Sequence, residues 1–281
     1  GSNNTIETNT IVGSFDAIRL SGQNNIIIGN IITNNNDALY LGYFAKYNTI
    51  ISNTITKNEY GILFDSGCDF NRILNNSITH NADAIHISAD SNIISGNTIS
   101  NNTGTVIYIG KNEGNTIRKN IITHNNGDGI RLFGNKNNVS VNIICNNKEN
   151  GIFLENCMFN SIIGNSIKKN NGSGIYLSDS KNNSLLNNTI ADNSYEGVRL
   201  FGDNNTISRN TIAKNNNGIY FLGHKYNTIT DNNITSNNWS GIFLNCSDRN
   251  MISGNSISKN RQGIFIVSST NNTVLKNNFQ R

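Results

Sequence analysis

Apolar and polar positions follow one rule along this chain: an asparagine recurs every five residues, usually with an isoleucine two places after it. The stretch 48–64, N-T-I-I-S-N-T-I-T-K-N-E-Y-G-I-L-F, shows this rule and ends in a short apolar run. A five-residue step is too short for a helix and contains no apolar i, i+3, i+4 pattern. It predicts three short strands joined by tight turns, at Thr49 to Ile50, Thr54 to Thr56 and Gly61 to Phe64.

The unit repeats from one end of the chain to the other with a period of about 22 residues. Its first asparagine stands at Asn4, Asn25, Asn48, Asn71, Asn92, Asn115, Asn137, Asn160, Asn183, Asn205, Asn227, Asn250 and Asn272. Because side chains alternate in a strand, Ile50, Ile55, Ile62 and Phe64 are expected to point inward and to form columns when coils stack. The pattern therefore predicts an all-β parallel solenoid of about twelve coils, with three short strands in each coil.

The asparagine rows have a physical cause of their own. Asparagine tolerates the left-handed backbone conformation that tight corners demand, so we expect the repeated asparagines to adopt it. Their amides can also hydrogen-bond from coil to coil and satisfy polar groups that a buried corner would otherwise strand.

The repeat predicts a single domain over residues 3–281, and we take Gly1 and Ser2 as a cloning remnant. No capping segment is evident at either end, which indicates a fragment of a larger protein. The four cysteines fall in different coils, and Cys145 and Cys157, in neighbouring coils, occupy different positions within the coil, so free thiols are expected. The formal charge of +4 is modest and its cations are scattered, which argues against nucleic-acid binding. No apolar run is long enough to predict membrane insertion.

Repeats of the form N-N-T-I-x-x-N-x-I-x-x-N-x-x-G-I-x-L resemble the right-handed parallel β-helix repeats of the NosD-like and pectate-lyase-like superfamily of carbohydrate-binding proteins and sugar hydrolases. The resemblance covers nearly the whole chain and implies a right-handed β-helix. Lyases, hydrolases, epimerases and binding or adhesion proteins share this scaffold. The composition, rich in asparagine and isoleucine, is also similar to that of methanogen surface proteins, including disaggregatases, which degrade a polysaccharide matrix. An extracellular or cell-surface location is implied.

In enzymes of this superfamily the site lies outside one strand face, which directs attention to the outward row of the G-I-x-L strand. The row comprises Arg19, Tyr40, Leu63, His86, Tyr108, Arg131, Phe153, Tyr176, Arg199, Tyr220, Phe243 and Phe265, with Phe133 and Phe201 as further outward rings. Rings about 4.8 Å apart match the spacing of sugar units, and arginine suits uronate or sulfate groups. A subunit interface and plain stacking between neighbouring strands are the alternatives. We select Arg19, Tyr40, Phe133, Phe153, Tyr176, Arg199, Phe201 and Tyr220 as substrate-binding candidates.

Two catalytic sets follow from this row. In the first, Asp65, Asp83, His86, Tyr108 and Arg131 lie on adjacent coils. Lyases and epimerases need a base, an acid and a cation that holds the uronate carboxylate, and His86 or Tyr108 with Arg131 would fill those roles. In the second, Asp128, Glu155 and Asp179 lie on coils six to eight, at separations of about 5 to 10 Å that suit glycoside hydrolysis.

Acidic residues also precede several of these strands. Asp16, Asp37, Asp83, Asp128 and Glu196 stand at the corner, and four of the strands carry Arg19, His86, Arg131 or Arg199 three residues later. Capping of the turn and pairing with the base is the simpler role for these acids. His80, His124 and His224 sit at corners and are expected to be solvated. No zinc-type spacing occurs, and calcium beside Asp65, Asp83 and Asp90 is the one metal that we consider.

The resulting hypothesis is an extracellular protein that binds and degrades a polysaccharide, by hydrolysis or by β-elimination of a uronic acid. The alternative is a non-catalytic carbohydrate-binding or surface adhesion module that forms homo-oligomers through its aromatic row.

Overall fold

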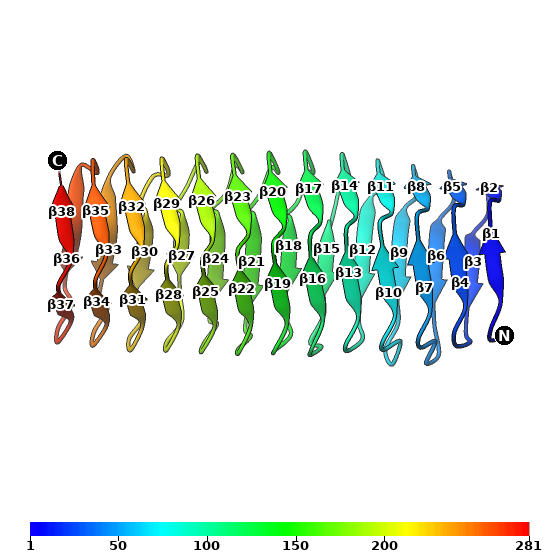
Figure 1. Ribbon diagram of the computed structural model, residues 1–281, viewed down its shortest axis with the longest axis horizontal. Helices are drawn as coiled ribbons and strands as arrows, with labels where there is room; N and C mark the ends of the chain where they lie inside the picture. Colours follow the sequence, from blue (N-terminus) through cyan, green and yellow to red (C-terminus); the bar gives the residue numbers. More distant parts are fainter. Residues whose placement is uncertain (281) are drawn as a thin grey trace. The chain divides into compact units, whose positions relative to one another are not determined.

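The computed structural model describes residues 1–280, which form 38 strands and no helix. The strands belong to three parallel sheets, of thirteen, thirteen and twelve strands. The chain visits the first, second and third sheet in turn, so each coil contributes one strand to each (Figure 1). The predicted coil is confirmed by β7 (Thr49–Ile51), β8 (Thr54–Thr56) and β9 (Tyr60–Phe64). The protein is an all-β parallel solenoid of about twelve coils.

The chain forms two compact units, Gly1–Asn138 and Val139–Arg281. In the first unit, the first sheet contains β1 (Thr5–Glu7), β4 (Ile26–Ile28), β7, β10 (Arg72–Leu74), β13 (Ile93–Ser95) and β16 (Thr116–Arg118). The second sheet contains β2 (Thr10–Val12), β5 (Ile31–Thr33), β8, β11 (Ser77–Thr79), β14 (Thr98–Ser100) and β17 (Ile121–Thr123). The third contains β3 (Asp16–Leu20), β6 (Asp37–Leu41), β9, β12 (Asp83–Ile87), β15 (Ile107–Ile109) and β18 (Ile130–Leu132).

The second unit continues the same order of strands. Its first sheet contains β19 (Asn138–Ser140), whose first residue ends the first unit, then β22 (Ser161–Ile163), β25 (Ser184–Leu186), β28 (Thr206–Ser208), β31 (Thr228–Thr230), β34 (Met251–Ser253) and β37 (Thr273–Leu275). Its second sheet contains β20 (Ile143–Cys145), β23 (Ser166–Lys168), β26 (Thr189–Ala191), β29 (Thr211–Ala213), β32 (Asn233–Thr235), β35 (Ser256–Ser258) and β38 (Asn278–Gln280). Its third contains β21 (Ile152–Glu155), β24 (Ile175–Ser178), β27 (Val198–Leu200), β30 (Ile219–Leu222), β33 (Ser240–Asn245) and β36 (Gln262–Val267).

The first and second sheets each turn one column of apolar side chains into the core of their unit, and the third sheet turns two. Ile27, Ile50 and Ile73 occupy directly paired positions of the first sheet, and all three are fully buried. Ile55 of the second sheet and Phe64 of the third are also fully buried. Burial of each such side chain stabilises the fold by about 1.5–3 kcal/mol, so the register that aligns these columns is strongly favoured.

The asparagine rows form hydrogen-bonded ladders, as predicted. Asn25 Nδ2 donates to Asn48 Oδ1 at 2.9 Å, and Asn48 Nδ2 donates to Asn71 Oδ1 at 3.0 Å. The same oxygens accept the backbone N–H groups of the preceding coil, for example Asn25 N to Asn48 Oδ1 at 2.8 Å. The Asn48 and Asn71 amides therefore bond both the backbone and the side chain of the preceding asparagine, which satisfies the corner.

The prediction that the ladder asparagines adopt the left-handed backbone conformation is wrong. The left-handed residue is the one before each ladder asparagine, such as Ser52 (φ 57°) before Asn53 and Lys57 (φ 58°) before Asn58. Asn53 Nδ2 donates to Ile51 O at 3.1 Å and so closes the turn around Ser52. Because the amide, and not the residue it encloses, makes this bond, the left-handed position accepts many residue types.

The four cysteines are free thiols, as predicted. Among residues 1–280, no helix is long and apolar enough to cross a membrane.

Candidate functional site

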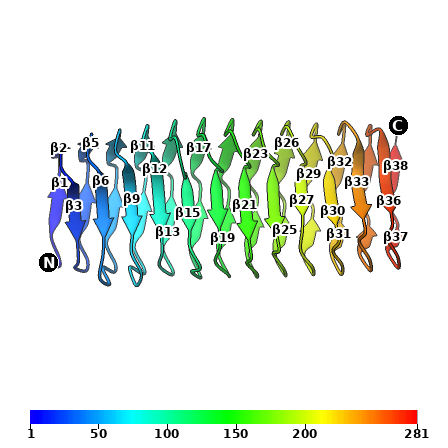
Figure 2. The same cartoon turned by 180° about the vertical axis from the view of Figure 1, so that it is seen from behind.

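The outward row of the third sheet has the register that the repeat predicts. In the first unit, Cα pairing joins Arg19 to Tyr40, Tyr40 to Leu63, Leu63 to His86, His86 to Tyr108 and Tyr108 to Arg131. In the second unit it joins Phe153 to Tyr176, Tyr176 to Arg199, Arg199 to Tyr220, Tyr220 to Phe243 and Phe243 to Phe265. Figure 2 shows the third-sheet strands of each unit side by side. These two runs are called the outward row below.

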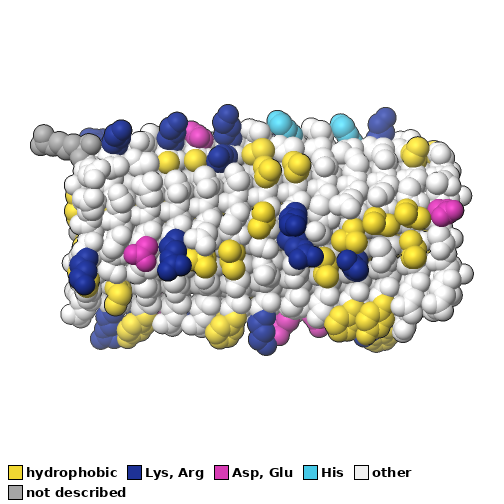
Figure 3. Space-filling model, viewed as in Figure 1, with side chains coloured by type: hydrophobic (Ala, Val, Ile, Leu, Met, Phe, Trp, Pro, Cys, Tyr) yellow, Lys and Arg dark blue, Asp and Glu magenta, His cyan; other side chains and the backbone are white. Residues whose placement is uncertain are grey.

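The rings of the outward row contact one another within each unit. Phe153 and Tyr176 have ring centroids 5.0 Å apart, Tyr220 and Phe243 are 5.2 Å apart, and Phe243 and Phe265 are 5.0 Å apart. The face formed by the first and second sheets differs: most side chains there are neither hydrophobic nor charged (Figure 3). Aromatic rings are therefore concentrated on the third sheet, because aromatic residues recur at one outward position of its repeat.

His86 and Tyr108 form a stacked ring pair, with centroids 4.3 Å apart. Burial lowers the pKa of His86, and the nearby Asp83 carboxylate opposes that shift. The imidazole is therefore neutral at pH 7 and able to accept a proton. Asp83 itself accepts the backbone N–H of Thr105 at 2.6 Å. The first predicted catalytic set thus has His86, Tyr108 and Arg131 in consecutive register positions.

Asp65 forms its hydrogen bond with a residue outside that set, Tyr40. Its carboxylate accepts a hydrogen bond from the Tyr40 hydroxyl, which raises the pKa of Tyr40 to about 12. Asp90 accepts the backbone N–H of Glu113 at 2.8 Å. Within the part of the chain that the structure describes, no group of three or more His, Cys, Asp or Glu residues is arranged to hold a metal ion. The calcium site considered for Asp65, Asp83 and Asp90 is therefore not formed by these carboxylates.

The second predicted set divides between the units. Asp128 belongs to the first unit, in the turn before β18, whereas Glu155 and Asp179 belong to the second. Glu155 ends β21 and pairs in register with Ser178, the residue before Asp179. Glu155 and Asp179 are therefore offset by one residue on adjacent coils, and their catalytic role stays a prediction.

The expected pairing of acid and base holds at one end of the outward row and fails at Arg199. Arg19 forms an ion pair with Asp16 at 3.0 Å. Arg199 has no ion pair among residues 1–280, and its buried Nε has no hydrogen-bond partner. Glu196 instead accepts the Ser173 hydroxyl at 3.4 Å. Among residues 1–280, therefore, no carboxylate forms an ion pair with Arg199.

Aromatic rings hold the Arg199 guanidinium in place of an acid. Its carbon lies 5.1 Å from the centroid of Tyr176 and 5.0 Å from that of Phe201. In the first unit, Arg131 lies over Phe133 in the same manner, at 5.2 Å. Cation–π contacts of this kind orient a guanidinium and leave its outer N–H groups available.

Arg199 and Tyr176 border a cavity of about 370 Å³ within the second unit. Its remaining lining residues are Lys148, Glu149, Asn150, Asn171, Gly172, Ser173 and Tyr195. The turns that precede β21, β24 and β27 supply these residues, so the cavity lies between the outward row and the adjacent corner. We call it the Arg199 cavity. Two of the predicted substrate-binding residues, Tyr176 and Arg199, thus share a concave site with one further cation, Lys148.

Three residues near the outward row were not predicted as site residues: Tyr195, Trp239 and Arg261. Tyr195 and Trp239 occupy corner turns directly before third-sheet strands, and their side chains are 55% and 49% exposed. Large rings at exposed turn positions, one of them the only tryptophan of the chain, were the available signal. The expectation for His224 was wrong: it is partly buried, with Nδ1 3.3 Å from Asp203 Oδ1 and its ring beside Phe201.

Several solved structures share this architecture at low sequence identity. The periplasmic alginate epimerase AlgG aligns with a TM-score of 0.73 and 15% identity over 91% of this chain and 76% of AlgG. The A-module of Azotobacter vinelandii mannuronan C-5 epimerase AlgE4 aligns with a TM-score of 0.64 and 14% identity, covering 100% and 89% of the two chains. The catalytic unit of a Streptomyces thermodiastaticus GH87 α-1,3-glucanase aligns with a TM-score of 0.70 and 15% identity, covering 96% and 62%. These similarities show the fold.

Sequence comparison identifies a family. No curated protein matches the chain in sequence. The family model described as "Right handed beta helix region" matches residues 1–93, 48–184, 83–224 and 150–281, which together span the chain. The matches agree with the three-sheet solenoid and with the handedness that the repeat resemblance implied. The chain belongs to the right-handed β-helix family.

Proposed function

We propose that the protein binds an acidic polysaccharide outside the cell, along the outward row and the Arg199 cavity of the second unit. One observation carries the proposal: Arg199 is oriented by two rings, has no acidic partner, and borders a cavity. A cation without a compensating carboxylate attracts an anionic ligand. The alginate and mannuronan named for the epimerases support an acidic polysaccharide by analogy of fold, and the α-1,3-glucanase supports a polysaccharide ligand in general.

The chemistry of the site suits a uronate or sulfated sugar. Tyr176, Tyr195 and Phe153 offer rings to the apolar faces of sugar units, as large aromatic side chains do in ligand sites. The forked N–H groups of Arg199 match a carboxylate or a sulfate in a bidentate geometry. Lys148 adds a second positive charge at the same cavity, and Glu149, which also lines it, disfavours an anion beside its own carboxylate.

Affinity electrophoresis in gels that contain a polyuronate or a neutral glucan tests the proposal. The polyuronate is expected to retard the wild-type protein more strongly than the neutral glucan does. Arg199→Ala is expected to lose about 10- to 100-fold in affinity, because hydrogen bonds to charged groups contribute about 1.5–3 kcal/mol. Arg118→Ala, which removes an exposed arginine from the first sheet, is the matched control. Equal retardation of Arg199→Ala and wild type would show that the Arg199 cavity is not part of the polysaccharide-binding site.

A chemical step in the first unit is the second part of the proposal. The neutral His86 imidazole, stacked on Tyr108, would take the proton beside a uronate carboxylate while Arg131 holds that carboxylate. In elimination, the bond from carbon to the glycosidic oxygen breaks and the leaving oxygen takes a proton, for which the Tyr108 hydroxyl is the candidate donor. Glu155 and Asp179 of the second unit are the proposed carboxylates for hydrolysis, and Asp128 is a separate candidate in the first unit.

Products distinguish these reactions. Incubation with polyuronates, followed by ultraviolet absorbance of the unsaturated uronate and by a reducing-end assay, separates elimination from hydrolysis. Absorbance that disappears in His86→Gln would support the first set. Reducing ends without absorbance would favour the carboxylate set. Retardation without either product leaves a binding module, and a stable oligomer that protects the outward row from ligand would favour the adhesion alternative.

A further inference from the structure

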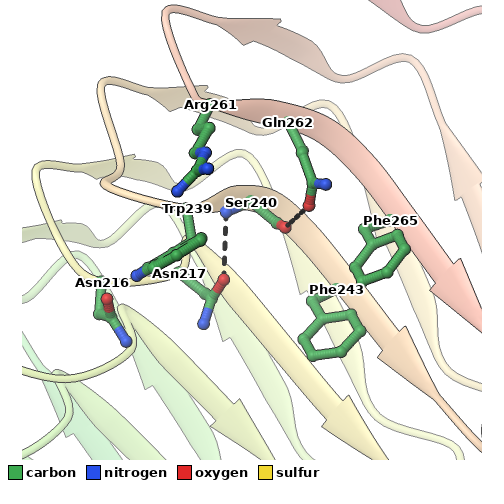
Figure 4. Close-up of a pocket in the computed structure, with 8 residues that line it drawn as sticks. All are labelled: Asn216, Asn217, Trp239, Ser240, Phe243, Arg261, Gln262 and Phe265. Carbon is green, nitrogen blue, oxygen red and sulfur yellow. Dashed lines mark hydrogen bonds between the residues drawn. The ribbon is translucent and has the colours of Figure 1, made fainter.

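A second cavity of the second unit lies apart from the Arg199 cavity. It has a volume of about 360 Å³ and lies at the strands β33 and β36, where the corner turns before them meet the outward row (Figure 4). Trp239 and Arg261 form one side, and Phe243 and Phe265 form the other (Figure 4). No acidic residue lines it. We call it the Trp239 cavity.

The two sides of the Trp239 cavity are both aromatic. Arg261 lies over the Trp239 ring, with its guanidinium carbon 4.4 Å from the ring centroid. Phe243 and Phe265 are stacked with an interplanar angle of 14°. Trp239 is 49% exposed and Phe265 40% exposed. Two exposed ring surfaces that flank one hollow are suited to a flat ligand with apolar faces, such as a sugar ring.

Between the two sides runs a line of hydrogen bonds (Figure 4). Asn217 Oδ1 accepts the backbone N–H of Ser240 at 3.1 Å, and the Ser240 hydroxyl donates to Gln262 Oε1 at 3.0 Å. Both amides therefore use their oxygens within the protein. Among residues 1–280 neither NH₂ group donates a hydrogen bond, and residue Asn217 as a whole is 8% exposed. The cavity thus offers hydrogen-bond donors, together with the Arg261 cation.

We propose that the Trp239 cavity is a subsite for one uronic acid residue, which extends the proposed polysaccharide site and rests on that proposed function. The sugar ring packs against Trp239 or Phe243, and its carboxylate accepts from Arg261 and from the amide of Asn217 or Gln262. A neutral sugar would leave the guanidinium without an anion and is bound more weakly. Phe243 lies two register positions beyond Arg199, about 10 Å along the sheet, so two acid-binding points follow the same row.

Intrinsic fluorescence reports this site directly, because Trp239 is the only tryptophan of the chain. The probes are glucuronate, galacturonate and mannuronate, each compared with glucose, galactose or mannose. Uronates are expected to change Trp239 emission at concentrations at least 10-fold lower than the neutral sugars. Arg261→Ala is expected to weaken the uronate response at least 10-fold. Arg249→Ala removes an arginine that also contacts an aromatic ring, Tyr226, but lies outside the cavity, and is expected to respond as wild type does.

The outcomes separate the subsite from the proposed function. An equal response to uronates and neutral sugars, or an unchanged response in Arg261→Ala, would overturn the acid subsite. If no sugar changes the Trp239 emission while polyuronate still retards the protein in an Arg199-dependent manner, the subsite is overturned and the proposed function is retained. A uronate-selective response without any retardation by a polymer would support the subsite and refute polysaccharide binding. Circular dichroism of each variant verifies that it is folded.

Discussion

Asn188 is the most informative position for testing what holds the coils together. Its side chain is fully buried in the second ladder. Asn188 Nδ2 donates to Ile162 O at 2.8 Å and to Asn210 Oδ1 at 3.0 Å. Its Oδ1 accepts from Asn165 N at 2.9 Å and from Asn165 Nδ2 at 3.0 Å. Asn188→Ala removes all four hydrogen bonds at once and leaves the backbone free to keep its conformation.

The size of the effect follows from those bonds. Asn165 N–H loses its acceptor in a buried corner, which costs about 1–3 kcal/mol, and the other three bonds contribute about 0.5–1.5 kcal/mol each, so the loss is expected to be about 2.5–7.5 kcal/mol. Asn165 Nδ2 keeps a bond to Val139 O at 2.9 Å, which favours the lower half of that range.

Denaturant unfolding followed by far-ultraviolet circular dichroism measures the loss. Asn233→Ala removes an exposed asparagine of β32 and is the control, expected to change the free energy of unfolding by less than about 0.5 kcal/mol. If Asn188→Ala costs no more than Asn233→Ala, the ladder amides serve the turn conformation alone, and our account of the corner is wrong. A loss confined to one of two unfolding transitions would assign the effect to the second unit.

Three further predictions concern single groups. Gly197→Ala places a Cβ 2.7 Å from Gly218 O and 2.5 Å from Ile212 Cγ2, and is expected to lower the free energy of unfolding by about 1–3 kcal/mol; an unchanged melting temperature would contradict this. Burial lowers the pKa of His86, so the stability it contributes is present above its ordinary value of about 6.5 and is lost as pH falls through the lowered pKa. Between pH 7 and pH 5 the wild type should therefore lose more stability than His86→Gln, and parallel pH profiles would refute the neutral buried imidazole. Asp65→Asn replaces the carboxylate that raises the pKa of Tyr40 to about 12 by a neutral amide; phenolate absorbance, with Tyr40→Phe as background, should then show a Tyr40 pKa closer to the ordinary value of about 10.

The outward row of the candidate site was predictable, because a fixed period places Tyr176, Arg199 and Tyr220 at one register position wherever the coils stack in parallel. The partners of the row were less predictable. Glu196 stands three residues before Arg199, as Asp16 does before Arg19, yet only Arg19 forms the ion pair. The difference depends on Ser173 of the neighbouring coil, whose hydroxyl engages Glu196, and sequence spacing does not encode that competition.

The sequence by itself determined the solenoid, its three strands per coil, its buried isoleucine columns and its asparagine ladders. A local period of five residues and a longer period of about 22 leave one arrangement that buries the apolar positions and satisfies the amides. Only the tertiary structure decided which residue takes the left-handed corner, which arginine lacks an acid, and that Trp239 faces Phe243 across a cavity. These features depend on side-chain contacts between successive coils, where several partners of similar chemistry compete and their geometry selects one.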